Sequence, residues 1–256
     1  MLEDLYAGAA EDSARRRSTV SASQLEAAIA KRRPPIDALK ALQPRDRVHV
    51  LAEIKRSSPS KGSLASIEDP AALASIYQRH GASAISVLTE QRKFKGSLED
   101  LEQVREVVSV PLLRKDFISN EYQLLEARAH GADIFLLIVA GLDAATLMRL
   151  KVFGEDLGMT AFVETHSGDE LKIASDLGAR LIGVNARDLT TFETDRYLFS
   201  KLVEDFPAGA IKVAESAVRE VADVVAYRNA GADVVLVGEA LVTGDPASRL
   251  DEFLNA

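Results

Sequence analysis

The chain has 256 residues, 47% of them hydrophobic and 27% charged, with a net charge of −8 at pH 7 and no cysteine. This length allows a sizeable buried core. The acidic balance argues against a non-specific nucleic-acid binder, and the lack of cysteine excludes disulfides, thiolate metal sites and cysteine nucleophiles.

The longest apolar run, from Ile134 to Ala140, is far shorter than the ~20 residues of a membrane helix. The N-terminus also lacks the basic and then apolar pattern of a signal peptide. These patterns predict a cytoplasmic protein that has neither a membrane nor a nucleic acid as its partner.

Residues 1–46 have the pattern of a helical extension before the first strand. Ser23 to Glu26 have the spacing of a capping box, and an apolar stripe that includes Leu25 and Ile29 ends before Pro34. We expect these extra helices to cover one end of the fold formed by residues 47–256.

Four Gly-Ala pairs repeat along the rest of the chain. They begin at Gly81, Gly131, Gly178 and Gly231, at steps of 50, 47 and 53 residues. Each pair follows an amphipathic stretch and precedes a short apolar run. This order is typical of a helix that ends at a glycine and leads into a buried parallel strand.

Four more strands are predicted between these units, at Val48 to Ile54, Val110 to Arg114, Met159 to Glu164 and Ile211 to Glu215. Helical patterns separate the strands, for example at Pro70 to Arg79, Leu98 to Val107, Glu121 to His130 and Asp169 to Asp176. Eight alternating units predict an α/β fold, a closed (β/α)8 TIM barrel with residues 1–256 as a single domain. The alternative is an open doubly wound sheet, but no Gly-x-Gly-x-x-Gly follows the first strand.

Charged residues at the ends of these strands indicate where the site lies. Glu53 and Lys55 are two residues apart on an apolar strand, so their side chains face the same way. Removing such a pair from water costs roughly several kcal/mol, so its presence needs a functional reason. Barrel chemistry takes place at the C-terminal strand ends, where other strands supply Lys115, Glu164, Asn185, Arg187, Glu215, Ser216, Gly238 and Glu239.

The residue types at these strand ends predict acid/base catalysis. Two lysines and at least two glutamates in a partly dry pocket supply both a proton donor and an acceptor at neutral pH. Asn185 donates and accepts hydrogen bonds, and Arg187 supplies a cationic fork suited to carboxylate or phosphate. A solvated rim is the alternative explanation for any one of these charges taken alone.

A phosphate site is the second prediction for the same end of the barrel. Backbone N–H groups after strands seven and eight often bind phosphate in such barrels, and Ser216-Ala217 and Gly238-Glu239 occupy those places. Ser58 adds a hydroxyl from the first loop. A plain strand-to-helix turn is the alternative explanation for Gly238.

The four histidines, His49, His80, His130 and His166, show no metal-ligand spacing. We therefore expect no metal site and assign all four histidines to turns or to the surface.

Five segments resemble, in their order and position, the signature segments of the indole-3-glycerol phosphate synthase family. They are Glu53 to Ser60, Leu113 to Phe117, Val163-Glu164, Gly183 to Leu189 and Ala214 to Ser216. The resemblance extends from the N-terminal helices to the last strand.

The resemblance implies the substrate 1-(2-carboxyphenylamino)-1-deoxyribulose 5-phosphate, which loses CO₂ and water as an indole ring closes, and it implies no cofactor. Lys115 would then be the general acid at the carbonyl, and Glu164 the general base. Lys55 would bind the anthranilate carboxylate, with Glu53 and Asn185 holding it and the hydroxyls in place.

The same resemblance implies a set of substrate-binding residues for this phosphorylated small molecule. We expect the protein to be a monomer, although no sequence pattern gives the oligomeric state. Arg187 would bind the carboxylate or the sugar hydroxyls. The phosphate, the aromatic ring and the remaining substrate atoms would be held by Ser58, Phe94, Phe117, Leu189, Glu215, Ser216, Ala217, Gly238 and Glu239.

Ala217 departs from the family, which usually has glycine at this position. If the backbone there has a positive φ, alanine costs ~1 kcal/mol or more and weakens phosphate binding. Three other functions stay open: another phosphosugar barrel enzyme, a reconstructed or redesigned barrel that only binds, and a retro-aldolase with a Schiff-base lysine.

Overall fold

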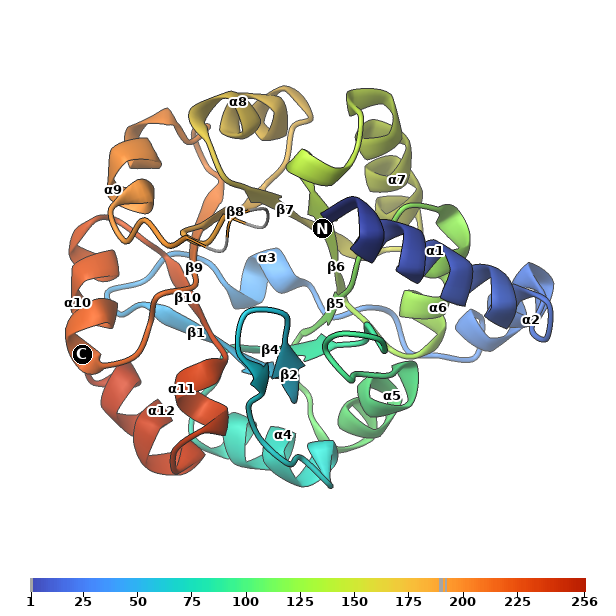
Figure 1. Ribbon diagram of the computed structural model, residues 1–256, viewed down its shortest axis with the longest axis horizontal. Helices are drawn as coiled ribbons and strands as arrows, with labels where there is room; N and C mark the ends of the chain where they lie inside the picture. The colour runs from blue at the N-terminus through green and yellow to red at the C-terminus, as the bar shows by residue number, and fades with distance from the viewer. Residues whose placement is uncertain (1, 189–190, 192) are drawn as a thin grey trace.

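A computed structural model describes residues 2–188, 191 and 193–256 of the chain. In this part of the chain, parallel strands close into a barrel in the order β1-β10-β9-β8-β7-β6-β5-β4, with helices around it (Figure 1). The predicted (β/α)8 TIM barrel is confirmed, and the open doubly wound sheet is wrong.

The barrel strands follow the apolar runs of the sequence. They are β1 (His49–Ile54), β4 (Ala84–Leu88), β5 (Leu112–Lys115), β6 (Ile134–Ile138), β7 (Thr160–Thr165), β8 (Leu181–Asn185), β9 (Ile211–Glu215) and β10 (Val234–Val237). A short antiparallel hairpin of β2 (Ser57–Ser58) and β3 (Gly62–Ser63) follows β1. The four strands whose bounds were predicted end within one residue of the observed strands.

The helices that follow the strands cover the outside of the barrel. They are α4 (Pro70–Arg79), α5 (Leu98–Val107), α6 (Glu121–Ala129), α7 (Ala144–Asp156), α8 (Gly168–Asp176), α9 (Leu198–Leu202), α10 (Val221–Asn229), α11 (Glu239–Val242) and α12 (Pro246–Leu254), with the 3-10 turns η1 (Val139–Gly141) and η2 (Val203–Asp205). The four repeated glycines have φ values between 67° and 95° and follow helices, as predicted.

The barrel strands alternate their side chains between two apolar layers. Leu51, Leu113 and Phe162 belong to the cluster inside the barrel, whereas Val50 and Ala52 pack outward against the helices. Both faces are buried, which is why these strands read as continuous apolar runs. The inward positions nearest the C-terminal strand ends are those that carry the polar residues.

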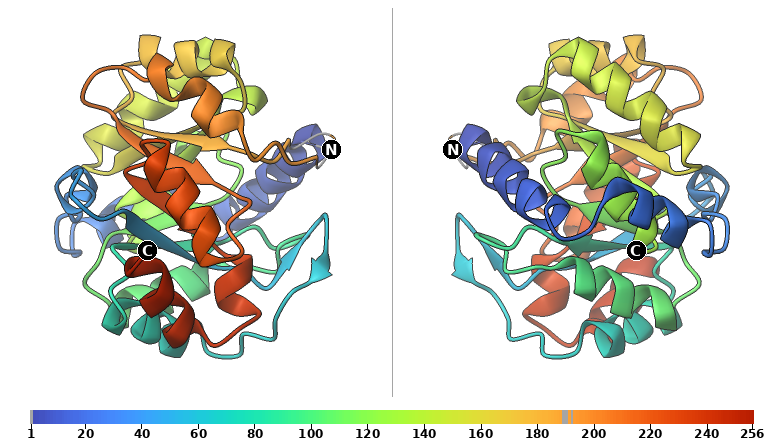
Figure 2. Two further views of the ribbon diagram at one scale, coloured as in Figure 1. Left: turned by 90° about the vertical axis from the view of Figure 1, so that its left-hand side faces the viewer. Right: turned by 90° about the vertical axis from the view of Figure 1, so that its right-hand side faces the viewer.

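Of the N-terminal helices, α1 (Leu2–Arg17) and α3 (Ala38–Ala41) contact the two ends of the barrel, and α2 (Ala22–Ile29) packs against α6 on the outside. Helix α1 lies across the C-terminal end (Figure 2), where Tyr6 packs edge-on against Phe117 with ring centroids 5.6 Å apart. Ala38 and Leu42 join the interior apolar cluster from the other end. The extension thus covers two ends rather than the one predicted, because residues 33–37 carry the chain past α6 without helical structure.

The cap of α2 also differs from the prediction. The N-cap is Ser21, whose Oγ accepts a hydrogen bond from the Gln24 backbone N–H at 3.2 Å. The Gln24 side chain accepts in return from the Ser21 backbone N–H at 2.8 Å. The capping box therefore begins at Ser21, two residues before Ser23, because a glutamine side chain can accept the hydrogen bond from the N-cap backbone N–H just as a glutamate side chain can.

A buried ion-pair network fastens α1 to the barrel. Glu126 of α6 binds Arg16 of α1 at 2.8 Å and Arg114 of β5 at 3.4 Å. The Arg114 side chain is fully buried and also donates to Asp116 at 2.8 Å and to the Gln123 carbonyl at 2.5 Å. Buried charges such as these are tolerated only when they are paired, so the network holds together as a unit.

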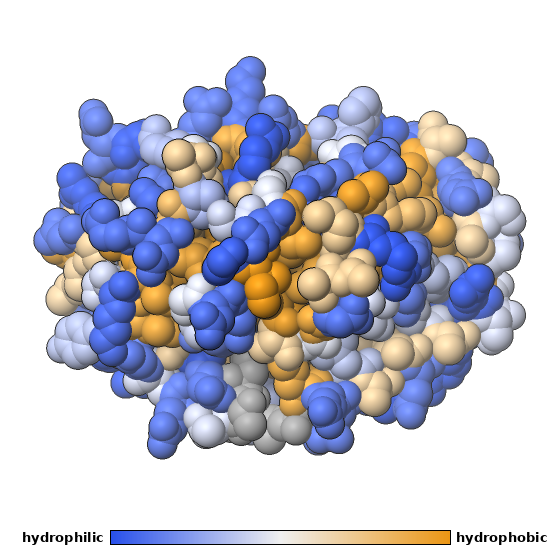
Figure 3. All heavy atoms as spheres, turned by 90° about the horizontal axis from the view of Figure 1, so that it is seen from above, coloured by the Kyte–Doolittle hydropathy of each residue, from blue (hydrophilic) through white to orange (hydrophobic). Residues whose placement is uncertain are grey.

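Every helix among the described residues is too short or too polar to span a bilayer. Helices α7 and α8 expose the apolar side chains of Met148, Val152 and Ile173. Figure 3 shows apolar and hydrophilic side chains mixed over the face seen from above. Exposed apolar residues of this kind are ordinary at protein surfaces.

Replacing Arg114 should be costly. Arg114→Met is expected to lower the free energy of unfolding by about 3–5 kcal/mol, because it leaves buried carboxylates of Asp116 and Glu126 without this partner. Urea denaturation measures the loss. Arg149→Met, which breaks an exposed pair with Glu121, is the control and should cost less than about 1 kcal/mol. Equal losses in the two variants would contradict the prediction.

Candidate active site

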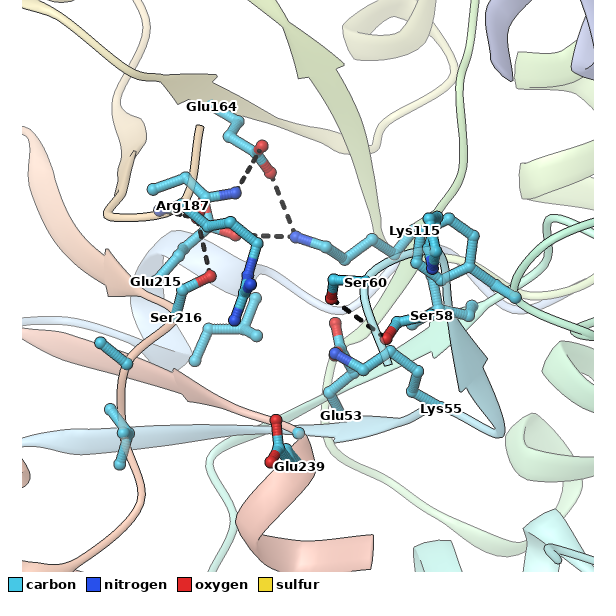
Figure 4. A pocket seen from close by; sticks show the side chains of 18 of the residues that line it. Glu53, Lys55, Ser58, Ser60, Lys115, Glu164, Arg187, Glu215, Ser216 and Glu239 are labelled. Carbon is cyan, nitrogen blue, oxygen red and sulfur yellow. Dashed lines mark hydrogen bonds and ion pairs between the residues drawn. The ribbon is translucent and has the colours of Figure 1, made fainter. Parts of the chain in front are cut away.

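A cavity of about 380 Å³ opens at the C-terminal end of the barrel (Figure 4). All the predicted site residues that the structure describes line this cavity: Glu53, Lys55, Ser58, Phe94, Lys115, Phe117, Glu164, Asn185, Arg187, Glu215, Ser216, Ala217, Gly238 and Glu239. The predicted ring contact Leu189 lies outside the described residues. These segments meet because all the barrel strands end at one rim.

Glu53 of β1 and Lys55, which follows β1 by one residue, face the cavity together, as their spacing predicts. The Lys55 Nζ lies 2.6 Å from the Glu53 Oε1. The Glu53 side chain is 2% exposed and that of Lys55 is 20% exposed, so the carboxylate is the deeper of the two. A Cβ on Gly238 would lie 2.4 Å from the Glu53 Oε1. The absence of a side chain at Gly238 therefore allows the Glu53 carboxylate to lie close to the backbone, and Gly238 also forms the turn after β10.

Lys115 lies at the centre of the cavity, between two carboxylates from other strands. Its Nζ donates to Glu164 Oε2 at 3.1 Å and to Glu215 Oε2 at 2.7 Å (Figure 4). Burial alone would lower the pKa of Lys115, but the charges of Glu164 and Glu215 outweigh it and raise this pKa well above that of a free lysine. Lys115 is therefore an ammonium group at neutral pH.

Glu164 is held on both of its oxygens. Lys115 binds Oε2, and the Asn185 side-chain amide donates to Oε1 at 2.9 Å. Burial would raise the pKa of Glu164, but the charge of Lys115 and the neighbouring His166 hold it below that of a free carboxyl. Glu164 is therefore ionised, with an ammonium group beside it.

Asn185 is itself fixed by the loop residues that follow β8 and β9. Its Oδ1 accepts from the Ser216 hydroxyl at 2.7 Å and from the Arg187 backbone N–H at 3.0 Å. The amide orientation is thus determined, because one side accepts from two donors while the other donates to Glu164. This arrangement holds the Glu164 carboxylate in one position.

Glu215 has a different protonation state from Glu164. Its Oε1 is buried and makes no hydrogen bond with any described residue. Burial and the charge of Glu164 raise the pKa of Glu215 to about 8, against the opposing effect of Lys115. Its side chain folds over Gly183, where a Cβ would lie 2.2 Å from Oε1. The cavity thus holds one ionised carboxylate and one carboxylic acid on the same lysine.

The loop after β9 has an unusual backbone. Ser216 and Ala217 have φ values of 67° and 61°, a left-handed conformation that favours glycine. The condition stated for Ala217 is therefore met, because the backbone at this position has a positive φ.

On the facing loop, Lys61 of the β2–β3 hairpin pairs with Glu239 at the start of α11.

An aromatic wall closes one side of the cavity. Phe94 and Phe117 pack with ring centroids 6.1 Å apart, and the ring of Tyr6 of α1 packs edge-on against Phe117. The Glu90 carboxylate holds the loop of Phe94 by accepting from the backbone N–H groups of residues 92, 93 and 94 at 2.7–2.9 Å. A flat aromatic group in the cavity could therefore pack against this wall.

A family model described as indole-3-glycerol phosphate synthase matches residues 2–253. The indole-3-glycerol phosphate synthase of Leifsonia xyli subsp. xyli is 60% identical over 253 residues, which cover 99% of this chain and 97% of that protein. Indole-3-glycerol phosphate synthase 1 of Streptomyces coelicolor is 51% identical over 257 residues, which cover 100% and 95%. The chain belongs to the indole-3-glycerol phosphate synthase family.

Membership confirms the resemblance drawn from the five segments, and it makes the chain an enzyme, a carboxy-lyase of tryptophan biosynthesis. Solved structures agree on the fold alone. The 3-hexulose-6-phosphate synthase of Salmonella typhimurium aligns with a TM-score of 0.64 at 14% identity, over 81% of this chain and 97% of that one. The N-acetylmannosamine-6-phosphate 2-epimerase of Clostridium perfringens gives 0.63 at 15%, over 83% and 93%.

The prediction that all four histidines lie in turns or at the surface is wrong for His49, and His166, in the bend after β7, has a neighbour that was not predicted. His49 is buried in β1, where Ser83 and the Gln43 carbonyl satisfy its ring. His166 lies beside Glu164, with Nε2 at 3.3 Å from Oε1. The alternation that paired Glu53 with Lys55 also puts residues 164 and 166 on one side, so the signal was present.

The cavity also has lining residues that the sequence did not predict, among them Leu5, Arg196 and Arg219. Leu5 belongs to α1, and no sequence pattern indicated that this helix reaches the site. No group of three His, Cys, Asp or Glu in the described ranges is arranged to hold a metal ion.

The high pKa of Glu215 has a consequence for stability. Folding raises this pKa from 4.5 to about 8, so the folded state binds more protons than the unfolded state between these values. The free energy of unfolding therefore falls as pH rises through this window. Glu215→Gln removes this titration. The melting temperature of the variant, relative to that of the wild type, should therefore increase as the pH rises from 5 to 8.

Thermal denaturation followed by circular dichroism at pH 5, 6.5 and 8 measures this difference in melting temperature. Glu252→Gln, which changes an exposed carboxylate on α12, is the control. A constant difference between Glu215→Gln and wild type across the three pH values would contradict the raised pKa.

Proposed function

We propose that this chain closes the indole ring of 1-(2-carboxyphenylamino)-1-deoxyribulose 5-phosphate. The ring carbon that bears the carboxylate attacks the ribulose C2 carbonyl, and the carbonyl oxygen takes a proton to become a hydroxyl. The bond to the carboxylate then breaks and releases CO₂, which restores the ring electrons. Loss of the hydroxyl as water, with removal of a ring proton, gives indole-3-glycerol phosphate.

Lys115 is the proposed acid for the carbonyl. The observation that carries the proposal is its position between Glu164 and Glu215, which keeps it protonated inside a cavity. A fixed ammonium group there stabilises the negative charge that develops on the carbonyl oxygen. It also donates the proton that this oxygen needs.

Glu164 is the proposed base for the later proton removal. It is ionised, buried and oriented by Asn185, so it does not need to reorganise when a proton arrives. Lys55, at 2.6 Å from Glu53, is the proposed site for the anthranilate carboxylate and an acid for the dehydration. Arg187 is proposed to bind the same carboxylate or the sugar hydroxyls.

The phosphate and the aromatic ring of the substrate are proposed to bind different parts of the cavity. Ser58, Ser216, Ala217, Gly238 and Glu239 would surround the phosphate, and the wall of Phe94 and Phe117 would hold the aromatic ring. Two anchors hold the flexible ribulose chain folded over the ring, so remote binding energy brings the reacting carbons together. A cytoplasmic monomer without a cofactor stays our prediction.

The retro-aldolase alternative fits these contacts poorly. A Schiff-base lysine must lose its proton to attack a carbonyl, so it is usually desolvated without a negative partner. Lys115 has two carboxylate partners, and Lys55 pairs with Glu53. The charges of Glu164 and Glu215 favour the ammonium form of Lys115 and therefore support acid/base chemistry.

Activity of the wild type and of Lys115→Met tests the proposal. Addition of the substrate to the wild type should give indole fluorescence, and Lys115→Met should lower the rate by at least about 100-fold, the usual share of a general acid. Lys172→Met, on the outside of α8, should keep the wild-type rate. Similar rates with Lys115→Met would reject Lys115 as the acid, and no product from the wild type would reject the proposed function.

The strained backbone at residue 217 gives a second prediction. Ala217→Gly removes a Cβ from a left-handed residue, so the loop can take up its phosphate-binding conformation at a lower cost, by up to about 1 kcal/mol. We expect a KM up to about fivefold lower in Ala217→Gly, with kcat little changed. Initial rates over a range of substrate concentrations measure both constants, and equal KM values would contradict a role for this strain.

A further inference from the structure

His166 lies between the proposed base and the protein surface. It follows β7 by one residue, so its side chain emerges on the same side as that of Glu164. The imidazole is 11% exposed, and its Nε2 lies 3.3 Å from Glu164 Oε1. This nitrogen is buried and makes no aligned hydrogen bond with any described residue, so the contact with Glu164 is electrostatic.

The other side of the ring is held by the start of α8. Ser167 is the N-cap of this helix, and its Oγ accepts from the Glu170 backbone N–H at 3.2 Å. The Glu170 carboxylate turns back and accepts from the His166 backbone N–H at 2.7 Å. The same oxygen lies 3.1 Å from the His166 Nδ1. The helix cap therefore fixes the ring that faces Glu164.

We propose that His166 is a positioning residue that holds the Glu164 carboxylate in its reactive orientation and keeps it ionised. Glu164 Oε2 is bound by Lys115, which must give up a proton during the reaction proposed above. At that moment Glu164 would lose a charged partner inside the barrel. His166 is a second cation that takes no part in the proton transfer, and it lies on the other oxygen.

The charges around the ring fit this role. Glu164 on β7 and Glu170 on α8 face the imidazole, and beyond Glu164 lie Lys115 on β5 and Glu215 on β9. Burial alone would lower the pKa of His166, but its interactions with the two nearest carboxylates raise it to about 10. The ring is therefore an imidazolium throughout the neutral range.

Two substitutions of His166 separate positioning from packing. His166→Leu removes the cation and should lower kcat by about 10-fold with KM within about twofold of wild type, because the base is misplaced rather than the substrate lost. His166→Gln keeps an N–H donor and should recover part of this loss. His80→Gln is the matched control, since His80 also pairs with a carboxylate, Asp251, far from the cavity.

A third substitution acts through the pH profile. Glu170→Gln removes one of the two carboxylates that keep the imidazole charged, so the pKa of His166 falls and the cation is lost at a lower pH. The ratio of wild-type to Glu170→Gln kcat should therefore increase between pH 6 and pH 9. Adding Glu170→Gln to His166→Leu should produce no such increase, because the titrating ring is already absent.

Nuclear magnetic resonance reads the charge of the ring without any turnover. The ¹⁵N shifts of the His166 ring, assigned with His166→Gln, should show both nitrogens protonated at pH 8 in the wild type. A neutral ring at pH 8 would overturn the proposal. So would a His166→Leu enzyme that keeps kcat within twofold, or a ratio for Glu170→Gln that does not change with pH.

The inference rests on the proposed function, and these experiments distinguish the two. If the wild type forms product and His166→Leu has the same kcat, the positioning role is rejected and the proposed function is retained. If the wild type forms no product, the proposed function fails, and the ring shifts at pH 8 still decide whether His166 holds Glu164 as a cation. Melting temperatures of the His166 variants show whether a loss of kcat comes from misfolding.

Discussion

The ammonium group of Lys115 between the carboxylates of Glu164 and Glu215 is the interaction on which the site depends. Each of these groups alone in a buried cavity would be driven to its neutral form. Together they form one ammonium, one carboxylate and one carboxylic acid, because Lys115, His166 and the Asn185 amide all favour the charged form of Glu164, whereas burial and the charge of Glu164 favour the neutral form of Glu215. A proton donor and a proton acceptor therefore lie 3.1 Å apart at neutral pH. This is the electrostatic condition for acid/base chemistry within one cavity.

The barrel makes that arrangement possible by separating apolar from polar positions along each strand. Inward residues such as Leu51 and Leu113 fill the interior, and the next inward positions at the strand ends carry the charges. The charges can be held close because the layer below them is packed and cannot take up water. Helix α1 adds a second boundary, since Tyr6 supports the aromatic wall through Phe117 and Arg16 joins the buried network of Arg114.

Much of this could be predicted because the signals are local. The spacing of Glu53 and Lys55 correctly predicts that both face the cavity, since alternation depends only on the backbone, although Lys55 lies one residue beyond β1. The errors have equally definite causes. The spacing of Ser23 and Glu26 predicts a cap at Ser23, whereas the cap is Ser21, because Ser21 and Gln24 have the same spacing and glutamine also closes a capping box. The contact of His166 with Glu164 was not predicted, because the absence of metal-ligand spacing does not reveal whether a histidine pairs with a carboxylate.

The order of strands and helices, the barrel and the polar residues at its rim can all be derived from the amino-acid sequence, because they follow from hydrophobic periodicity and from turn residues that are close together in the chain. Which charges meet is a property of the folded chain. Lys115 is 49 residues from Glu164 and 100 residues from Glu215, so their contact depends on how the closed barrel sets the strand registers. The protonation states follow from that contact, since each group's pKa is set by the charges that the fold brings within a few ångströms.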